Sequence, residues 1–194
     1  MAPTGTAPPR LPDVRDACRG HRRLVVGRPA QRRRTTAGSI ADKRREDSVK
    51  IQSLGHVVLK VRDRAKAEAF YNGVLGLLVA ARSDVLKMTF FTLGGTHHDF
   101  AISEVGKDAP GTAREAVGLS HVAFKIGDDI ETLKRAKAEL DAAGIQNGAA
   151  DHGVSKSLYF ADPDGNRIEL YVDQSDEWKR DPSAVASFKP LTLS

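Results

Sequence analysis

The sequence has very little cysteine and no long apolar segment, and both absences limit what the protein can be. The single cysteine, Cys18, excludes an intramolecular disulfide and any zinc site built on several thiolates. No apolar run approaches the roughly 18 residues needed to cross a bilayer, and the first residues lack the apolar centre of a secretory signal. We therefore expect a cytoplasmic protein without a membrane partner, in which any metal is held by histidine and carboxylate.

Positive charge is concentrated at the N-terminus. Residues 1–50 hold 13 Lys and Arg against 5 Asp and Glu, whereas residues 51–194 hold 17 against 20. The first stretch has few apolar positions and no sustained period, which predicts a disordered basic extension. No nucleic-acid partner is expected, because acids are mixed in and no aromatic residues alternate with the basic ones. An alternative is that this extension is not native and that the protein starts near Val49.

An internal repeat begins where the extension ends. The segment GHVVLKVRD at 55–63 matches SHVAFKIGD at 120–128, with His, Val, Lys and Asp identical. Each copy alternates with period two, as a strand with one buried face requires. His56 and His121 therefore lie on the less apolar face of two equivalent strands.

Each repeat strand is followed by an acidic helix start, a helix and shorter apolar strands. Helices are predicted after Asp63 and after Asp129, the second ending at Gly144. Three strands follow each helix, at 77–81, 87–93 and 98–103 in the first copy and at 145–149, 155–161 and 167–172 in the second. The fold class is α+β: two βαβββ modules, about 51–105 and 118–174, form a curved mixed sheet around a concavity. Residues 175–194 form a C-terminal tail.

The last strands of the two copies differ at one informative position. An offset of 68 residues places Phe91 over Tyr159, His98 over Asn166 and Ala101 over Glu169. Glu169 lies between Ile168 and Leu170, so its carboxylate faces the inner side of the sheet, beside the turn DPDG. Ala101 leaves the equivalent position without a ligand.

His56, His121 and Glu169 are thus two histidines and one carboxylate at related strand positions. Such a triad leaves coordination sites open and is the arrangement of non-haem Fe(II) enzymes that use O₂. A single strand histidine is more often structural, but the repeat makes the joint pattern hard to explain by packing alone. We therefore predict a metal site at these three residues.

These motifs resemble a known family. The paired HV strands and the segment YFADPDGNRIELY resemble the vicinal oxygen chelate superfamily, which includes glyoxalases, bleomycin-binding proteins, fosfomycin-modifying enzymes and extradiol ring-cleavage dioxygenases. The resemblance covers residues 51–174. It supports the same three metal ligands, but a fold-level match does not choose the chemistry.

Two further histidines favour the extradiol dioxygenases. HDFAI, with His98, resembles the segment that brings a histidine to the oxygen side of the metal, and HGVS, with His152, resembles the one that serves the bound catechol. With Tyr159, these are the catalytic residues that the resemblance implies. It also implies Fe(II), with Mn(II) as the alternative metal, and a catechol-type substrate with O₂. His97 is expected to be a solvated turn residue.

Other functions remain open at this level. Fosfomycin-type thiol transferases also use two histidines, one glutamate and a tyrosine, and glyoxalase-like enzymes use a fourth ligand that Ala101 cannot supply. A non-catalytic bleomycin-type drug-binding protein would leave the metal triad unexplained. A homo-oligomer is expected, with the site formed either within one chain or between halves of two chains.

Overall fold

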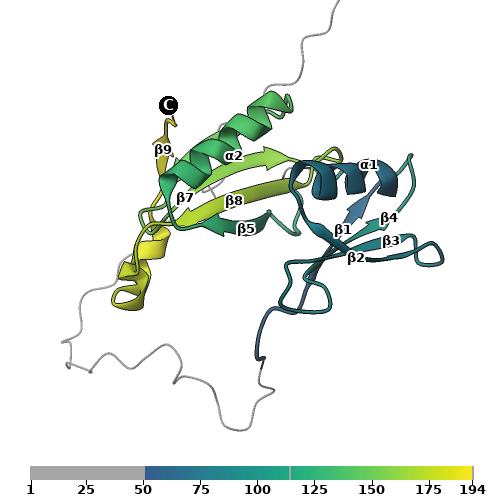
Figure 1. Ribbon diagram of the computed structural model, residues 1–194, viewed down its shortest axis with the longest axis horizontal. Helices are drawn as coiled ribbons and strands as arrows, with labels where there is room; N and C mark the ends of the chain where they lie inside the picture. The colour runs from purple at the N-terminus through teal and green to yellow at the C-terminus, as the bar shows by residue number, and fades with distance from the viewer. Residues whose placement is uncertain (1–50, 114, 194) are drawn as a thin grey trace, which may run out of the picture.

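The computed structural model describes residues 51–113 and 115–193, which form two modules in the predicted order (Figure 1). The predicted basic extension at 1–50, which includes Cys18 and His21, lies outside the described residues. Within the described part of the chain, no helix has the length and apolar character required to span a membrane.

The first module forms a four-stranded sheet in the order β1-β4-β3-β2. Strand β1 runs parallel to β4, and the other neighbours are antiparallel. Its elements are β1 (Val57–Val61), α1 (Arg64–Glu68), a π-helix η3 (Ala69–Val74), β2 (Leu78–Ser83), β3 (Met88–Thr92) and β4 (Phe100–Glu104).

The second module repeats this arrangement and adds a strand from the C-terminal tail. Its sheet has the order β5-β8-β7-β6-β9, again with a parallel first pair. Its elements are β5 (Val122–Gly127), α2 (Ile130–Ala142), β6 (Gly148–Asp151), β7 (Ser155–Ala161), β8 (Arg167–Asp173), η4 (Glu177–Lys179), η5 (Pro182–Ala186) and β9 (Lys189–Leu191).

The predicted α+β fold class is therefore confirmed, with one sheet in each module instead of a single continuous sheet. The register also confirms the repeat, since Val57 pairs with Phe100 and Val122 with Ile168 at equivalent positions. Strands β1 and β5 are edge strands, so within the described chain each has one side without a strand partner.

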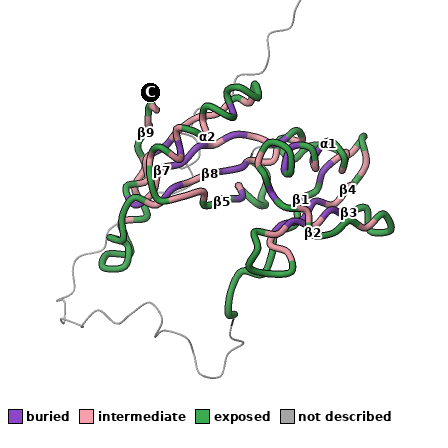
Figure 2. The backbone as a smooth tube through the Cα atoms, in the orientation of Figure 1, coloured by how far each residue is buried: buried purple, intermediate pink, exposed green. Residues whose placement is uncertain are grey.

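The strand faces and helix starts follow the sequence pattern. On β1, Leu59 and Val61 are buried whereas Val58 and Lys60 are exposed. Figure 2 shows how buried and exposed stretches are distributed along the backbone. The side chain of Asp63 accepts a hydrogen bond from the backbone N–H of Lys66 at 3.1 Å, and Asp129 caps α2 in the same way. These caps satisfy backbone donors that a helix start leaves unpaired.

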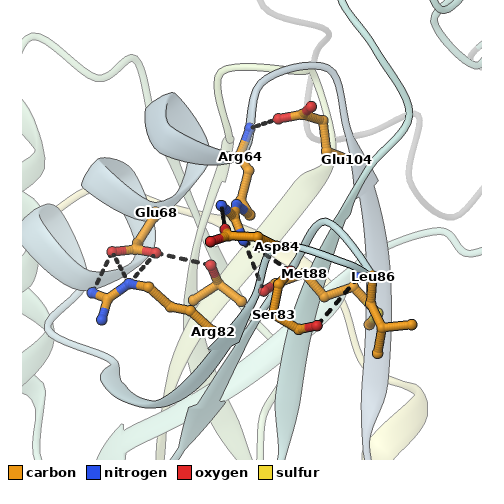
Figure 3. Close-up of polar contacts among 9 residues, drawn as sticks. Arg64, Glu68, Arg82, Ser83, Asp84, Leu86, Met88 and Glu104 are labelled. Carbon is orange, nitrogen blue, oxygen red and sulfur yellow. Dashed lines mark hydrogen bonds and ion pairs between the residues drawn. The ribbon is translucent and has the colours of Figure 1, made fainter.

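Ion pairs attach α1 to the neighbouring hairpin (Figure 3). The guanidinium of Arg64 donates to the backbone carbonyls of Ser83 and Met88 at 3.0 and 3.3 Å. The carboxylate of Glu68 accepts three hydrogen bonds from the guanidinium of Arg82, the shortest at 2.6 Å, and the pKa of Glu68 is lowered chiefly by this contact. Helix α1 is therefore fixed to β2 and β3 on the outer side of the first module.

A buried hydrogen bond joins the two modules. Tyr71, in the π-helix, is fully buried and donates its hydroxyl to Asp162 at 2.8 Å. Asp162 also accepts from the backbone N–H groups of Asp164 and Asn166 at 2.9 and 2.8 Å, which closes the DPDG turn. Burial, followed by the charge of Asp162, raises the pKa of Tyr71, so its hydroxyl remains a donor. This contact fixes the first module against the turn that leads into β8.

Tyr71→Phe should lower the free energy of unfolding by about 1–3 kcal/mol, because a buried carboxylate loses a donor. Tyr171→Phe is the matched control: among residues 51–113 and 115–193 the Tyr171 hydroxyl has no hydrogen-bond partner, so this substitution should cost less. Urea unfolding of both variants measures the difference. Equal stability of the two variants would contradict the role given to the Tyr71–Asp162 contact.

Candidate metal centre

The carboxylate of Glu169 lies in the middle of β8 on the face opposite to the core. Its neighbours Ile168 and Leu170 belong to the hydrophobic core, yet Glu169 itself is only 7% exposed. It pairs with Tyr159 on β7 and with Ala123 on β5. A buried carboxylate at this position requires polar partners, because burying an unpaired charge is costly.

His121 supplies the first of those partners. It directly precedes β5, and its Nε2 atom lies 2.9 Å from Oε2 of Glu169. Strand β5, which follows His121, runs parallel to β8, the strand of Glu169. An imidazole nitrogen and a carboxylate oxygen therefore converge on one point at the edge of the second sheet.

Ser157 supplies the second partner and was not predicted from the sequence. Its fully buried hydroxyl donates to Oε1 of Glu169 at 2.5 Å. Burial by itself raises the pKa of Glu169, but hydrogen bonds from His121 and Ser157 outweigh it and lower that pKa. Glu169 is therefore an ionised acceptor at neutral pH. The alternation of strand faces could have indicated Ser157, because it lies two residues before Tyr159 and therefore on the same face of β7.

Tyr159 and His152 complete a cluster with these residues. The Tyr159 hydroxyl lies 2.9 Å from Nε2 of His152. The ring of Tyr159 meets the ring of His121 edge on, with centroids 5.8 Å apart. Four predicted site residues, His121, His152, Tyr159 and Glu169, thus lie together in the second module.

The other two predicted histidines lie together in the first module. The rings of His56 and His98 are 4.4 Å apart, and Phe90 meets His98 edge on at 5.2 Å. His56 is exposed. The pKa of His98 is lowered by partial removal from water and then by the neighbouring His56 and His97. His97 is exposed and contacts His98 through its Nδ1 atom at 2.6 Å.

The position equivalent to Glu169 in the first module is Ala101, which is fully buried. Ala101 pairs with Val58 and with Phe90. The repeat mate of Tyr159 is therefore Phe90 and not Phe91, because Tyr159 pairs with Glu169 as Phe90 pairs with Ala101. The first module has His56 at the position equivalent to His121, but it has Ala101 where the second module has Glu169.

The predicted triad is accordingly divided: His56 lies in the first module, and His121 and Glu169 lie together in the second. Among residues 51–113 and 115–193, no three His, Cys, Asp or Glu side chains form a group that could hold a metal ion. His121 and Glu169 fit a divalent metal by their chemistry, since a neutral imidazole and an ionised carboxylate are suitable donors for iron or manganese. Ser157 would hold the metal-binding carboxylate from behind.

Comparison with known families identifies the class of this fold and site. Residues 53–170 match the model of the Glyoxalase/Bleomycin resistance protein/Dioxygenase superfamily. The chain belongs to this superfamily, as its repeat and its DPDG segment indicate.

Particular relatives include enzymes of different kinds. The chain is 34% identical over 129 residues to the catechol-2,3-dioxygenase of Bacillus subtilis, covering 66% of this chain and 44% of that protein. It is 34% identical to the biphenyl-2,3-diol 1,2-dioxygenase 3 of Rhodococcus globerulus, covering 73% and 80%. It is 29% identical to the metallothiol transferase FosB of Lysinibacillus sphaericus, covering 68% and 92%. The chain thus spans less than half of the Bacillus dioxygenase.

The fold is also that of a solved superfamily domain from Frankia. The two structures superpose with a TM-score of 0.56 at 19% identity, over 68% of this chain and 98% of the Frankia chain. At this identity the likeness concerns the fold alone.

Ser157→Ala should raise the pKa of Glu169, because it removes a hydrogen bond to the ionised form. The depressed pKa of Glu169 stabilises the fold above the unfolded-state value and ceases to do so as pH falls through the folded-state value, so the variant should lose about 1–3 kcal/mol of stability at pH 7. Carboxyl NMR titration and urea unfolding of the metal-free protein measure both effects. Ser155→Ala on the same strand is the control. An unchanged Glu169 titration in Ser157→Ala would contradict this assignment.

Proposed function

We propose that the protein is an Fe(II)-dependent extradiol dioxygenase that cleaves the ring of a catechol-type aromatic with O₂. The observation that carries this proposal is the contact between His152 and Tyr159 beside the His121–Glu169 pair. An imidazole nitrogen and a phenol hydroxyl beside an imidazole and a carboxylate are the groups that this chemistry needs, which supports the proposal. The two dioxygenase relatives support the same chemistry.

In this proposal His56, His121 and Glu169 hold the metal, with Mn(II) as an alternative to Fe(II). When bound, Fe(II) would supply electron exchange between a catechol and O₂. Glu169 contributes the negative charge, and its hydrogen bond from Ser157 keeps the carboxylate oriented. The reducing cytoplasm expected from the single cysteine suits a ferrous cofactor.

The remaining polar residues handle protons. The Nε2 atom of His152 would accept a proton from a catechol hydroxyl, because a neutral imidazole has one nitrogen with a free lone pair. The Tyr159 hydroxyl would then hydrogen-bond to the substrate oxygen in place of His152. His98 would donate a proton on the oxygen side, and its lowered pKa makes its protonated form a stronger acid.

A second copy of the chain would bring the separated residues together. His56 is exposed beside β1, and His121 directly precedes β5; both strands are edges of their sheets. The neighbouring apolar residues Val58 and Leu54 are 43% and 82% exposed. In a two-fold dimer, β1 of one copy would lie along β5 of the other, and each copy would complete the other's site.

A second candidate function is that of a metal-dependent thiol transferase acting on fosfomycin. The alignment with FosB covers 92% of that protein, compared with 80% of the Rhodococcus dioxygenase and 44% of the Bacillus dioxygenase. Two histidines and one glutamate would serve that reaction as well. A glyoxalase-like reaction is less well supported because Ala101 supplies no fourth ligand.

Oxygen uptake after anaerobic loading of the full chain with Fe(II) tests the reaction class. A panel from catechol to 2,3-dihydroxybiphenyl should give a yellow ring-cleavage product with one O₂ consumed for each catechol. Bound iron with a silent panel, and consumption of thiol with fosfomycin after Mn(II) loading, would establish the transferase. Failure to retain either metal would favour a drug-binding protein.

Variants separate metal binding from proton transfer. His56→Ala, His121→Ala and Glu169→Ala should abolish iron retention and turnover together, whereas Glu131→Ala, which removes an exposed carboxylate of α2, should change neither. His152→Asn should keep the iron and lower kcat by about 10²–10⁴-fold. Wild-type turnover in His152→Asn would remove His152 from the mechanism.

A further inference from the structure

The C-terminal segment of the chain reaches the candidate site. After β8 the chain passes through η4 and η5 and returns as β9, which pairs with β6 so that Lys189 lies opposite Asp151 (Figure 1). The next residue after Asp151 is His152. Leu193 packs against the hydrophobic core beyond β9. The segment is thus held in place by the pairing of β9 and by the packing of Leu193. It lies next to the loop that carries His152.

Two consecutive residues of this segment contact the imidazole of His152. Its Nδ1 atom lies 3.1 Å from the backbone carbonyl oxygen of Ser187. The ring of Phe188 packs against the same imidazole, with centroids 5.7 Å apart and planes tilted by 56°. A Cβ atom at Gly153 would lie 3.4 Å from Cβ of Ser187, so the two backbone segments are in close contact.

The carbonyl of Ser187 decides which nitrogen of His152 carries the hydrogen. A carbonyl oxygen can only accept, so Nδ1 must be the protonated nitrogen. In the neutral ring, Nε2 is then the free acceptor, and it faces the Tyr159 hydroxyl at 2.9 Å. A base that is to take a proton from a substrate needs this tautomer, because the opposite one would present an N–H to the substrate.

We propose that Ser187 and Phe188 are positioning residues, which fix the tautomer and the ring orientation of His152 from the C-terminal segment. The inference rests on the proposed function for its catalytic consequence, but the tautomer itself does not depend on any reaction. The segment therefore belongs to the site, although it lies outside the residues that match the superfamily model.

Imidazole ¹⁵N NMR of the metal-free full chain at about pH 9, where an ordinary histidine is neutral, reads the tautomer directly. His152→Asn identifies the signals of His152. The wild-type protein should show a protonated Nδ1 and an unprotonated Nε2. A chain ending at Ala186 should show a mixture of tautomers, and Phe188→Ala should broaden or shift the same signals. If the shortened chain does not fold, Phe188→Ala alone carries the comparison.

Turnover of the iron-loaded variants provides the second readout. Phe188→Ala should lower kcat by about 10- to 100-fold with wild-type iron content and little change in KM, as loss of an orienting partner does. Val185→Ala, an exposed residue of η5 in the same segment, should leave the NMR signals and kcat unchanged.

The two proposals fail in different ways. An Nε2-protonated His152 in the wild-type protein, or an unchanged tautomer and ring signal in both the shortened chain and Phe188→Ala, would overturn the positioning role. The expected tautomer together with inactivity toward every catechol would retain the positioning role and reject the dioxygenase.

Discussion

A buried carboxylate on β8 constrains much of the second module. Glu169 is almost inaccessible to water, and its ionised form persists because His121 and Ser157 both contact it. The cost of burying a charge is offset only where such partners are built into neighbouring strands. At the equivalent position of the first module, Ala101 lies between Val58 and Phe90, which offer no side-chain hydrogen-bond donor. One module therefore supplies a carboxylate, and the other cannot.

The two modules carry different polar side chains at equivalent positions. The first module holds the ring pair of exposed His56 and half-buried His98, and the second holds the carboxylate of Glu169 with its polar neighbours. The Tyr71–Asp162 hydrogen bond fixes the two modules to each other, because it joins the π-helix η3 of the first module to the DPDG turn of the second. In this arrangement β1 and β5 remain as edge strands, and exposed edges with apolar flanks are surfaces on which another chain can pair. The proposed dimer uses those edges.

The sequence predicts local features well and long-range ones less completely. Period two and the acidic helix starts placed the strand faces of β1 and β5 and the caps at Asp63 and Asp129, because these depend on neighbouring residues. The motifs named His121 and Glu169 as ligands of one metal, and the structure brings these two side chains into contact. The strand β6 begins three residues later than predicted, since the backbone N–H of Ile145 bonds to the carbonyl of Leu140 at the end of α2 instead of to a strand. The alignment of Phe91 with Tyr159 was wrong by one residue. Phe90 is the residue that pairs with Ala101, as Tyr159 pairs with Glu169.

Contacts between distant segments could not be inferred in this way. Tyr71 lies in the helix predicted after Asp63, but its partner Asp162 is 91 residues away, so no local pattern relates the two. The tail showed no periodic pattern that would place Ser187 beside His152. The separation of His56 from His121 depends on how the modules pack, which no local pattern encodes.

Subunit mixing tests the central claim, that His56 of one chain completes the site of His121 and Glu169 in another. Differently tagged His56→Ala and Glu169→Ala chains, each without iron as a homodimer, are coexpressed and the mixed dimer is isolated. If the site is shared, one of its two sites has no substitution, so the mixed dimer should regain about half of the wild-type iron content and turnover. A mixed dimer without iron would contradict the account, because it would place all three ligands within one chain.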